Sequence, residues 1–125
     1  KHFVKKRNEI TKFYNKNFRN LPITLPSIRN NTTSSFHLYI IQIHAKIKNG
    51  RNIIYNKLRK LGIGVNLHYI PIHLQPFFFK KGFRKGQYKN SEIFYNHAIT
   101  LPLYCGLSRL QLNKIVRSVK KCIKN

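Results

Sequence analysis

Residues 64–76 have the sequence GVNLHYIPIHLQP and carry the densest cluster of potential ligand-binding side chains in the chain. Over 65–69 apolar and polar residues alternate, and this period of two predicts a β-strand. Pro71 and Pro76 then bound a loop that ends in Phe77-Phe78-Phe79. We therefore expect a strand that delivers the polar side chains of a proline-bounded loop to one end of a sheet.

The polar side chains of this stretch are suited to holding a polar ligand. Imidazole, phenol and amide groups can donate or accept hydrogen bonds, which suits hydroxyl and phosphate groups. The candidate ligand contacts are His68, Tyr69, His73 and Gln75. The alternative is a buried loop whose polar groups satisfy backbone hydrogen bonds, and the residue types fit both interpretations.

Upstream of this stretch, the apolar spacing predicts a helix over 3–19, followed by an irregular connector over 20–34. Residues 36–44 are apolar on both faces, which predicts an inner strand covered on two sides. After a turn at Lys48-Asn49-Gly50, a second helix is expected to end at Gly62 as its C-terminal cap.

Downstream, we expect a basic loop over 80–89, a short helix over 91–99 and an extended piece over 101–103. Ser108 and Gln111 have the spacing of a capping box and predict the start of a last helix. The side chains expected to face inward from the short helix are Phe94, His97 and Ala98. The buried stripe of the last helix is expected to comprise Leu112, Ile115, Val116, Val119 and Ile123.

These elements predict an α/β fold in which a short sheet is covered by helices. No internal repeat and no linker divides residues 1–125, so a single domain is expected. At 125 residues with 42% hydrophobic residues, the chain can bury a real core, which argues against disorder despite its charge.

The charge balance restricts the chemistry of the chain. It holds 25 basic residues against two acids, Glu9 and Glu92, and a formal net charge of +23. Chemistry that needs paired carboxylates, or a magnesium site built from carboxylates, is therefore outside the reach of this chain alone. A metal site is not expected either, because His68 and His73 match no standard zinc spacing.

The positive charge raises a basic nucleic-acid-binding module as the alternative function. Residues 81–88 match part of an RNA-recognition signature, but Arg84, Lys85 and Gly86 replace its central residues. The basic residues are also spread over the whole length, as AT-rich codon usage would produce. We therefore expect no specific nucleic-acid partner.

The two cysteines, Cys105 and Cys122, lack a C-x-x-C spacing, so we expect a reducing compartment and a cytoplasmic location. No apolar run approaches the roughly 20 residues of a membrane span, and the first residues lack the apolar region of a signal peptide. No membrane partner is therefore expected.

The chain as a whole resembles the C-terminal part of the DegT-type nucleotide-sugar aminotransferases, within the fold type I pyridoxal-phosphate enzymes. The most specific resemblance is residues 61–78, with the block His68-Tyr69-Ile70-Pro71 and then His73-Leu74-Gln75-Pro76. Further landmarks occur in the family's order: Arg7-Asn8-Glu9-Ile10 with Tyr14, Leu21-Pro22, Leu25-Pro26, Ser35-Phe36-His37-Leu38-Tyr39, Gly82-Phe83, Glu92, Tyr95, Leu101-Pro102-Leu103-Tyr104 and Leu107. Phe36 stands where the family has Trp, and Phe77-Phe78 where it usually has Tyr.

The resemblance implies that this segment is the small domain of a larger enzyme. In that family the large N-terminal domain, which this segment does not include, supplies the lysine that binds the cofactor and the acid that pairs with its pyridinium nitrogen. No catalytic and no cofactor-binding residue is therefore assigned to this chain. The resemblance places His68, Tyr69, His73 and Gln75 at the substrate. It implies that they position the substrate rather than transfer protons, since the cofactor lysine of the family handles the proton.

The whole enzyme would be a homodimer that uses pyridoxal 5'-phosphate to aminate a UDP-linked 4-keto-6-deoxy-hexosamine, with glutamate as the amino donor. The branch of the family that this block resembles lies on the route to pseudaminic acid. A third interpretation is a non-catalytic remnant that folds only with a partner.

Overall fold

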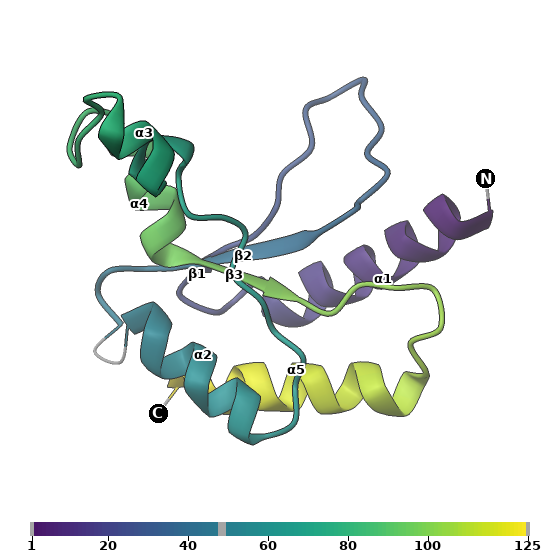
Figure 1. Cartoon of the computed structure of the whole chain (residues 1–125). Coiled ribbons are helices and arrows are strands. Elements are labelled where there is room, and N and C mark those ends of the chain that lie inside the picture. The colour runs from purple at the N-terminus through teal and green to yellow at the C-terminus, as the bar shows by residue number, and fades with distance from the viewer. Residues whose placement is uncertain (1, 48–49, 125) are drawn as a thin grey trace.

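The computed structural model describes residues 2–47 and 50–124 (Figure 1). At its centre lies a three-stranded antiparallel sheet in the order β1-β2-β3. β1 spans Ile23–Thr24, β2 spans Tyr39–Ile43 and β3 spans Ala98–Leu101. β2 is paired at both edges, which confirms the inner strand predicted within 36–44. The expected cover on both faces is only partial, because Ile40 and Gln42 are half-buried whereas Tyr39, Ile41 and Ile43 are buried.

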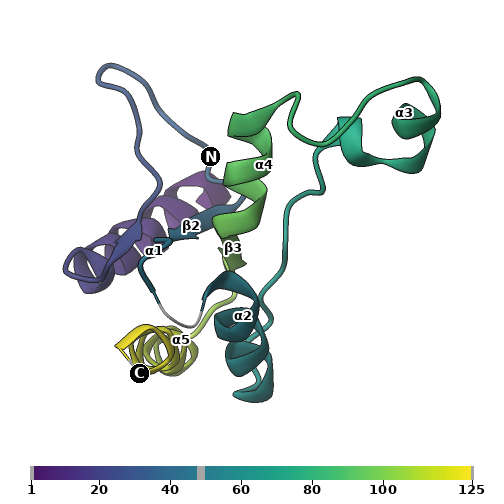
Figure 2. The ribbon, with the colours of Figure 1, turned by 90° about the vertical axis from the view of Figure 1, so that its left-hand side faces the viewer.

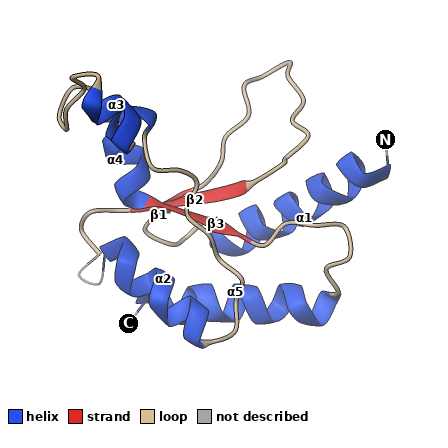
Figure 3. Ribbon diagram, viewed as in Figure 1, coloured by secondary structure: helices blue, strands red, loops and turns tan. Residues whose placement is uncertain are grey.

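Helices α1 (His2–Phe18), α2 (Gly50–Lys60) and α5 (Arg109–Lys124) cover the sheet, as the blue ribbons of Figure 3 show. α5 packs against both α1 and α2. The buried residues of each helix recur with helical spacing, so they form one face that is turned to the core. The stripe predicted for the last helix is buried at all five positions: Leu112, Ile115, Val116, Val119 and Ile123.

The ends of two helices are closed as their sequence predicted. Gly62 has φ +73°, and the N–H groups of Gly62 and Ile63 donate to the carbonyls of Arg59 and Leu58, so α2 ends in a glycine cap. At the start of α5, the Gln111 N–H donates to Ser108 Oγ at 3.2 Å, and the Ser108 N–H donates to Gln111 Oε1 at 2.9 Å. This capping box stabilises the helix by about 1 kcal/mol.

Residues 70–97 form an arm that projects from the sheet and the three long helices (Figure 2). The arm contains the 3-10 helix η1 (Ile72–Leu74), α3 (Pro76–Lys80) and α4 (Lys89–His97). α4 contacts β2 and α2, whereas α3 contacts η1. α4 is therefore the part of the arm that anchors it to the body.

The strand predicted over 65–69 is wrong. The only pairing of this stretch is a single bridge, in which Asn66 and Thr100 exchange backbone hydrogen bonds of 3.1 and 2.9 Å. The Asn66 side chain accepts a hydrogen bond from the Leu67 N–H at 2.8 Å, a local side-chain contact of the kind that competes with regular secondary structure. The alternation reflects partial burial beside β3 and not a continuous strand.

Three further expectations need correction. The connector over 20–34 contains β1, a strand too short to show a periodic pattern. The loop expected to end in three Phe residues contains η1 and α3 instead, because Pro76 occupies the first turn of α3, where its missing N–H costs nothing. The helix over 91–99 ends at His97, and the chain continues directly into β3.

The inward face of α4 also differs from the prediction. Phe94 is exposed and His97 is half-buried, whereas Ala98 is buried as expected at the first position of β3. The buried residue of α4 is Glu92, because the arm supplies hydrogen-bond donors to its carboxylate.

The turn expected at Lys48 and Asn49 lies outside the described residues. Among the described helices, none combines the length and the apolar character that crossing a membrane requires.

Candidate functional site

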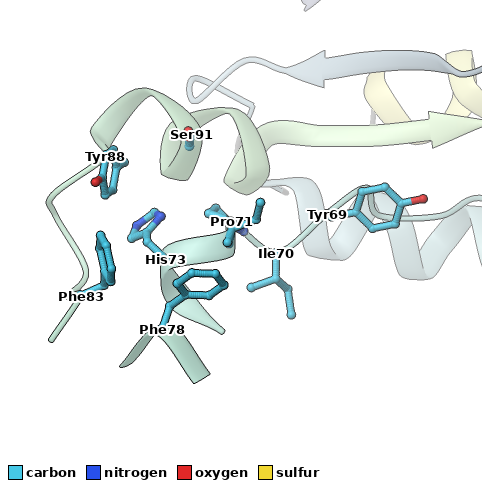
Figure 4. Close-up of a pocket in the computed structure, with 9 residues that line it drawn as sticks. Tyr69, Ile70, Pro71, His73, Phe78, Phe83, Tyr88 and Ser91 are labelled. Carbon is cyan, nitrogen blue, oxygen red and sulfur yellow. The ribbon is translucent and has the colours of Figure 1, made fainter. Parts of the chain in front are cut away.

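A pocket of about 480 Å³ opens between the stretch 69–73, α3 and the start of α4 (Figure 4). Its walls are mainly aromatic, with Phe78, Phe83 and Tyr88 around His73 and Tyr69 at the far edge beyond Ile70. Ser91 adds a hydroxyl group from α4. A concave site with apolar walls and a few polar groups is the usual form of a small-molecule site.

A buried pair of His73 and Glu92 joins the two sides of this pocket. His73 lies on η1 and is 6% exposed, and Glu92 lies on α4 and is 8% exposed. The distance from His73 Nε2 to Glu92 Oε1 is 2.9 Å. The same Oε1 accepts the N–H of Gly86 at 2.7 Å, so one carboxylate ties η1, the 81–88 loop and α4 together.

These hydrogen bonds hold Glu92 in its ionised form. The bond from His73 and then the bond from the Gly86 N–H lower the pKa of the Glu92 carboxyl, and they outweigh the desolvation that would raise it. The stabilisation that depends on ionised Glu92 is therefore present at neutral pH. It is lost only as the pH falls through the depressed pKa of the folded state.

The aromatic side chains pack on one another around the pair. The ring of Tyr88 lies 4.8 Å from the ring of His73, centroid to centroid. Phe83 lies 6.2 Å from Tyr88 and 5.9 Å from Phe78. Because the 81–88 loop carries two of these rings, fixing this loop through Gly86 also fixes a wall of the pocket.

Tyr69 and His73 are the two sequence-predicted contacts that line the pocket, and they lie at different ends of it (Figure 4). The Tyr69 side chain is 72% exposed, so its hydroxyl is accessible to a ligand. Gln75 lies at the N-terminal cap of α3, with its amide 3.5 Å from the Ile70 carbonyl, and does not line this pocket.

The fourth predicted contact, His68, lies beside the sheet. Its Nδ1 is 2.8 Å from Thr100 Oγ1, and its Nε2 is 3.4 Å from the Asn66 amide. His68 is half-buried there and does not line the pocket, although its ring packs edge-on against Tyr69 at 4.6 Å.

Glu92 and Tyr88 are two of the site residues that the prediction did not include. One signal was available for Glu92, because it is one of only two acids in a chain with 25 basic residues. A lone acid in such a chain is surrounded by potential donors and is a candidate for a specific contact. Tyr88 carries no comparable signal, since its place beside His73 depends on how the 81–88 loop folds.

The segment that resembles an RNA-recognition signature forms turns. Gly82 and Gly86 have φ values of +96° and +95°, and residues 81–88 contain no strand. The signature works by presenting stacking aromatic residues from a strand, so this segment does not form that module.

Within residues 2–47 and 50–124, no group of three or more His, Cys, Asp or Glu side chains is placed to hold a metal ion.

Comparison with known proteins gives related sequences and structures over almost the whole chain. An uncharacterized protein of Methanocaldococcus jannaschii is 36% identical over 122 residues, covering 95% of this chain and 32% of that protein. The UDP-4-amino-4,6-dideoxy-N-acetyl-beta-L-altrosamine transaminase of Helicobacter pylori is 32% identical over 119 residues, covering 94% of this chain and 32% of that protein. The chain thus spans about a third of the length of these relatives.

A solved structure shares the fold. A Streptococcus pneumoniae protein provisionally assigned as a sugar aminotransferase, in its pyridoxal-phosphate form, superposes with a TM-score of 0.90 at 30% identity. The match covers 98% of this chain and 32% of that one, and it confirms the predicted fold of helices on a short sheet. The profile of the DegT/DnrJ/EryC1/StrS aminotransferases matches residues 1–120. The chain therefore belongs to the DegT/DnrJ/EryC1/StrS aminotransferase family.

Proposed function

We propose that this chain is the small C-terminal domain of a pyridoxal-phosphate-dependent nucleotide-sugar aminotransferase. The substrate would be a UDP-linked 4-keto-6-deoxy-hexosamine, and glutamate would donate the amino group. The name of the Helicobacter pylori relative supports a UDP-linked amino-deoxy sugar, and the resemblance of residues 61–78 supports the pseudaminic acid route. The family's usual homodimer and a cytoplasmic location are part of the proposal.

The observation that carries the proposal is the aromatic pocket beside the His68–Pro76 block. A hexose presents apolar C–H faces and several hydroxyl groups. The rings of Tyr69, Phe78 and Tyr88 suit the apolar faces, whereas His73 and the hydroxyl group of Ser91 suit the hydroxyl groups. Positively charged side chains are abundant in the chain and would favour the approach of a diphosphate.

The residues of this chain do not by themselves fit the cofactor. Pyridoxal phosphate supplies an electron sink, and it needs a lysine for covalent attachment and a carboxylate at its pyridinium nitrogen. The Glu92 carboxylate is already engaged by His73 and Gly86, and Glu9 pairs with Lys6 at 3.3 Å on the exposed face of α1. Neither acid is placed for that role, so we assign cofactor binding to another part of the protein.

The proposal predicts where the cofactor attaches. When the complete gene product is loaded with pyridoxal phosphate and reduced with borohydride, the labelled lysine should lie outside residues 1–125. Peptide mapping by mass spectrometry locates the label. A single lysine within residues 1–125 that carries a stoichiometric label would contradict the domain assignment.

The same preparation tests the reaction. Incubation with glutamate and a UDP-linked 4-keto-6-deoxy-hexosamine should convert the keto group to an amine, detected as the mass of the amino sugar. UDP-N-acetylglucosamine has no keto group at that carbon and serves as the control substrate. Cofactor-loaded protein that aminates no UDP-linked keto sugar would refute the proposed function.

A further inference from the structure

The hydrogen bond between His73 and Glu92 determines which nitrogen of the imidazole carries a proton. His73 Nε2 faces Glu92 Oε1 at 2.9 Å, and an ionised carboxylate can only accept hydrogen bonds. Nε2 must therefore be the donor, whether the ring is neutral or protonated. The remaining nitrogen, Nδ1, is an acceptor when the ring is neutral and a donor when it is protonated.

Nδ1 of His73 is free to meet a ligand. It forms no hydrogen bond with any described residue. The only fully buried and unpaired side-chain nitrogen or oxygen in the described parts of the chain is Thr11 Oγ1, so Nδ1 keeps some access. Because His73 lines the aromatic pocket, Nδ1 is the polar atom that this ring can offer to a molecule bound there (Figure 4).

We propose that Glu92 is a positioning residue. It holds His73 through Nε2, so that Nδ1 can form a hydrogen bond with a hydroxyl group of a ligand in the pocket. A hydroxyl group both donates and accepts, so it pairs with Nδ1 in either state of the ring. The inference rests on the proposed function, because it takes the hydroxyl to belong to the sugar nucleotide.

Glu92 also positions the opposite wall of the pocket. Its Oε1 accepts the Gly86 N–H at 2.7 Å, and Gly86 precedes Tyr88 by two residues in the same loop. The Tyr88 ring then packs 4.8 Å from the His73 ring. One carboxylate oxygen therefore fixes the orientation of the His73 ring and the position of the Tyr88 wall. Loss of this oxygen should disturb both.

Substitutions at the two positions separate positioning from folding. In H73Q the glutamine amide nitrogen can take the place of Nε2 and still donate to Glu92, but no atom replaces Nδ1. In E92Q the amide oxygen can still accept from both His73 and Gly86, whereas E92L removes that acceptor. E9Q changes the other acid of the chain, which lies on the exposed face of α1, and is the matched control.

The first readout is the affinity of the complete gene product for UDP-N-acetylglucosamine, measured by calorimetry without turnover. H73Q should weaken binding about tenfold, the effect of one lost hydrogen bond, with its melting temperature unchanged. E92L should weaken binding by at least as much, E92Q should restore it to within about threefold of the native value, and E9Q should have no effect.

The second readout is independent of ligand and activity. In protein labelled with ¹⁵N-histidine, the His73 signal, identified by its absence in H73Q, should show the proton on Nε2. This preference should persist in E92Q and be lost in E92L. Should E92L fail to fold, H73Q and E92Q still decide the question.

The outcomes distinguish this inference from the proposed function. A His73 proton on Nδ1 in the native protein, or equal affinity of H73Q and the native protein, overturns the positioning role even if the protein is an active aminotransferase. Absence of amination with the expected tautomer and affinities intact overturns the proposed reaction and leaves the positioning role supported.

Discussion

Replacing His73 with alanine in the complete gene product should raise the KM for the UDP-linked keto sugar by about ten- to hundredfold, because both the pocket contact and the partner of Glu92 are lost. Steady-state kinetics measure this effect. The kcat and the cofactor content should stay close to the native values, because the role proposed for His73 is to position the substrate and cofactor binding is assigned to another part of the protein. The melting temperature should fall, because Glu92 keeps its negative charge without its strongest donor.

Tyr69→Phe is the companion to that substitution. The Tyr69 side chain is exposed and its hydroxyl forms no hydrogen bond with a described residue, so removing this oxygen should leave the melting temperature unchanged. The KM should still rise, by about fivefold or more, if the hydroxyl contacts the sugar nucleotide. If both variants turn over substrate normally and His73→Ala merely melts lower, the stretch is structural and the alternative of a self-satisfied loop is correct.

Leu58→Ala should lower the free energy of unfolding by about 3 kcal/mol, because it leaves a cavity where α2 meets the core. The Leu58 side chain is completely buried and belongs to the core cluster shared by the helices and the sheet. Urea unfolding followed by circular dichroism measures the change.

Leu110→Ala is the control for that substitution. Leu110 is 82% exposed near the start of α5, so the same deletion there should change the free energy of unfolding by less than about 0.5 kcal/mol. Equal effects at the two positions would mean that the core does not lie where the structure places it.

The long helices were predictable from the sequence because their evidence is local. The apolar residues of α1 and α5 repeat with the period of a helix over about three turns or more. Gly62 and the pair Ser108 and Gln111 mark helix ends through hydrogen bonds that span at most five residues. Such signals depend little on how the rest of the chain folds.

The sheet was harder to predict because its strands are short and depend on distant partners. β3 is buried at all four positions, so it shows no alternation, and it follows α4 without an intervening turn. Residues 65–69 do alternate, yet they lie where only Asn66 can pair with Thr100. A period of two reports burial on one side and does not establish that a partner strand exists.

In the candidate site, too, the features that depend on neighbouring residues were predictable and those that depend on distant residues were not. The block from His68 to Pro76 identified the stretch that forms one side of the pocket, because its ligand-binding residue types are adjacent in sequence. The Glu92 carboxylate reaches His73 across 19 residues only after the arm folds back on itself. No periodicity or spacing predicts such a contact, so the separate placement of His68, Gln75 and Glu92 had to come from the structure.

The position of β2 at the centre of the sheet has a consequence for the order of folding during synthesis. β1 precedes β2 in the chain, but the other partner of β2, β3, begins only at Ala98. One edge of an apolar strand thus stays open while the ribosome adds more than fifty residues, and open edges invite association between nascent chains. α1 is already made at that stage, and the Tyr14 ring lies 4.9 Å from the Tyr39 ring. This contact can form early, so α1 shields a face of β2 until β3 closes its edge.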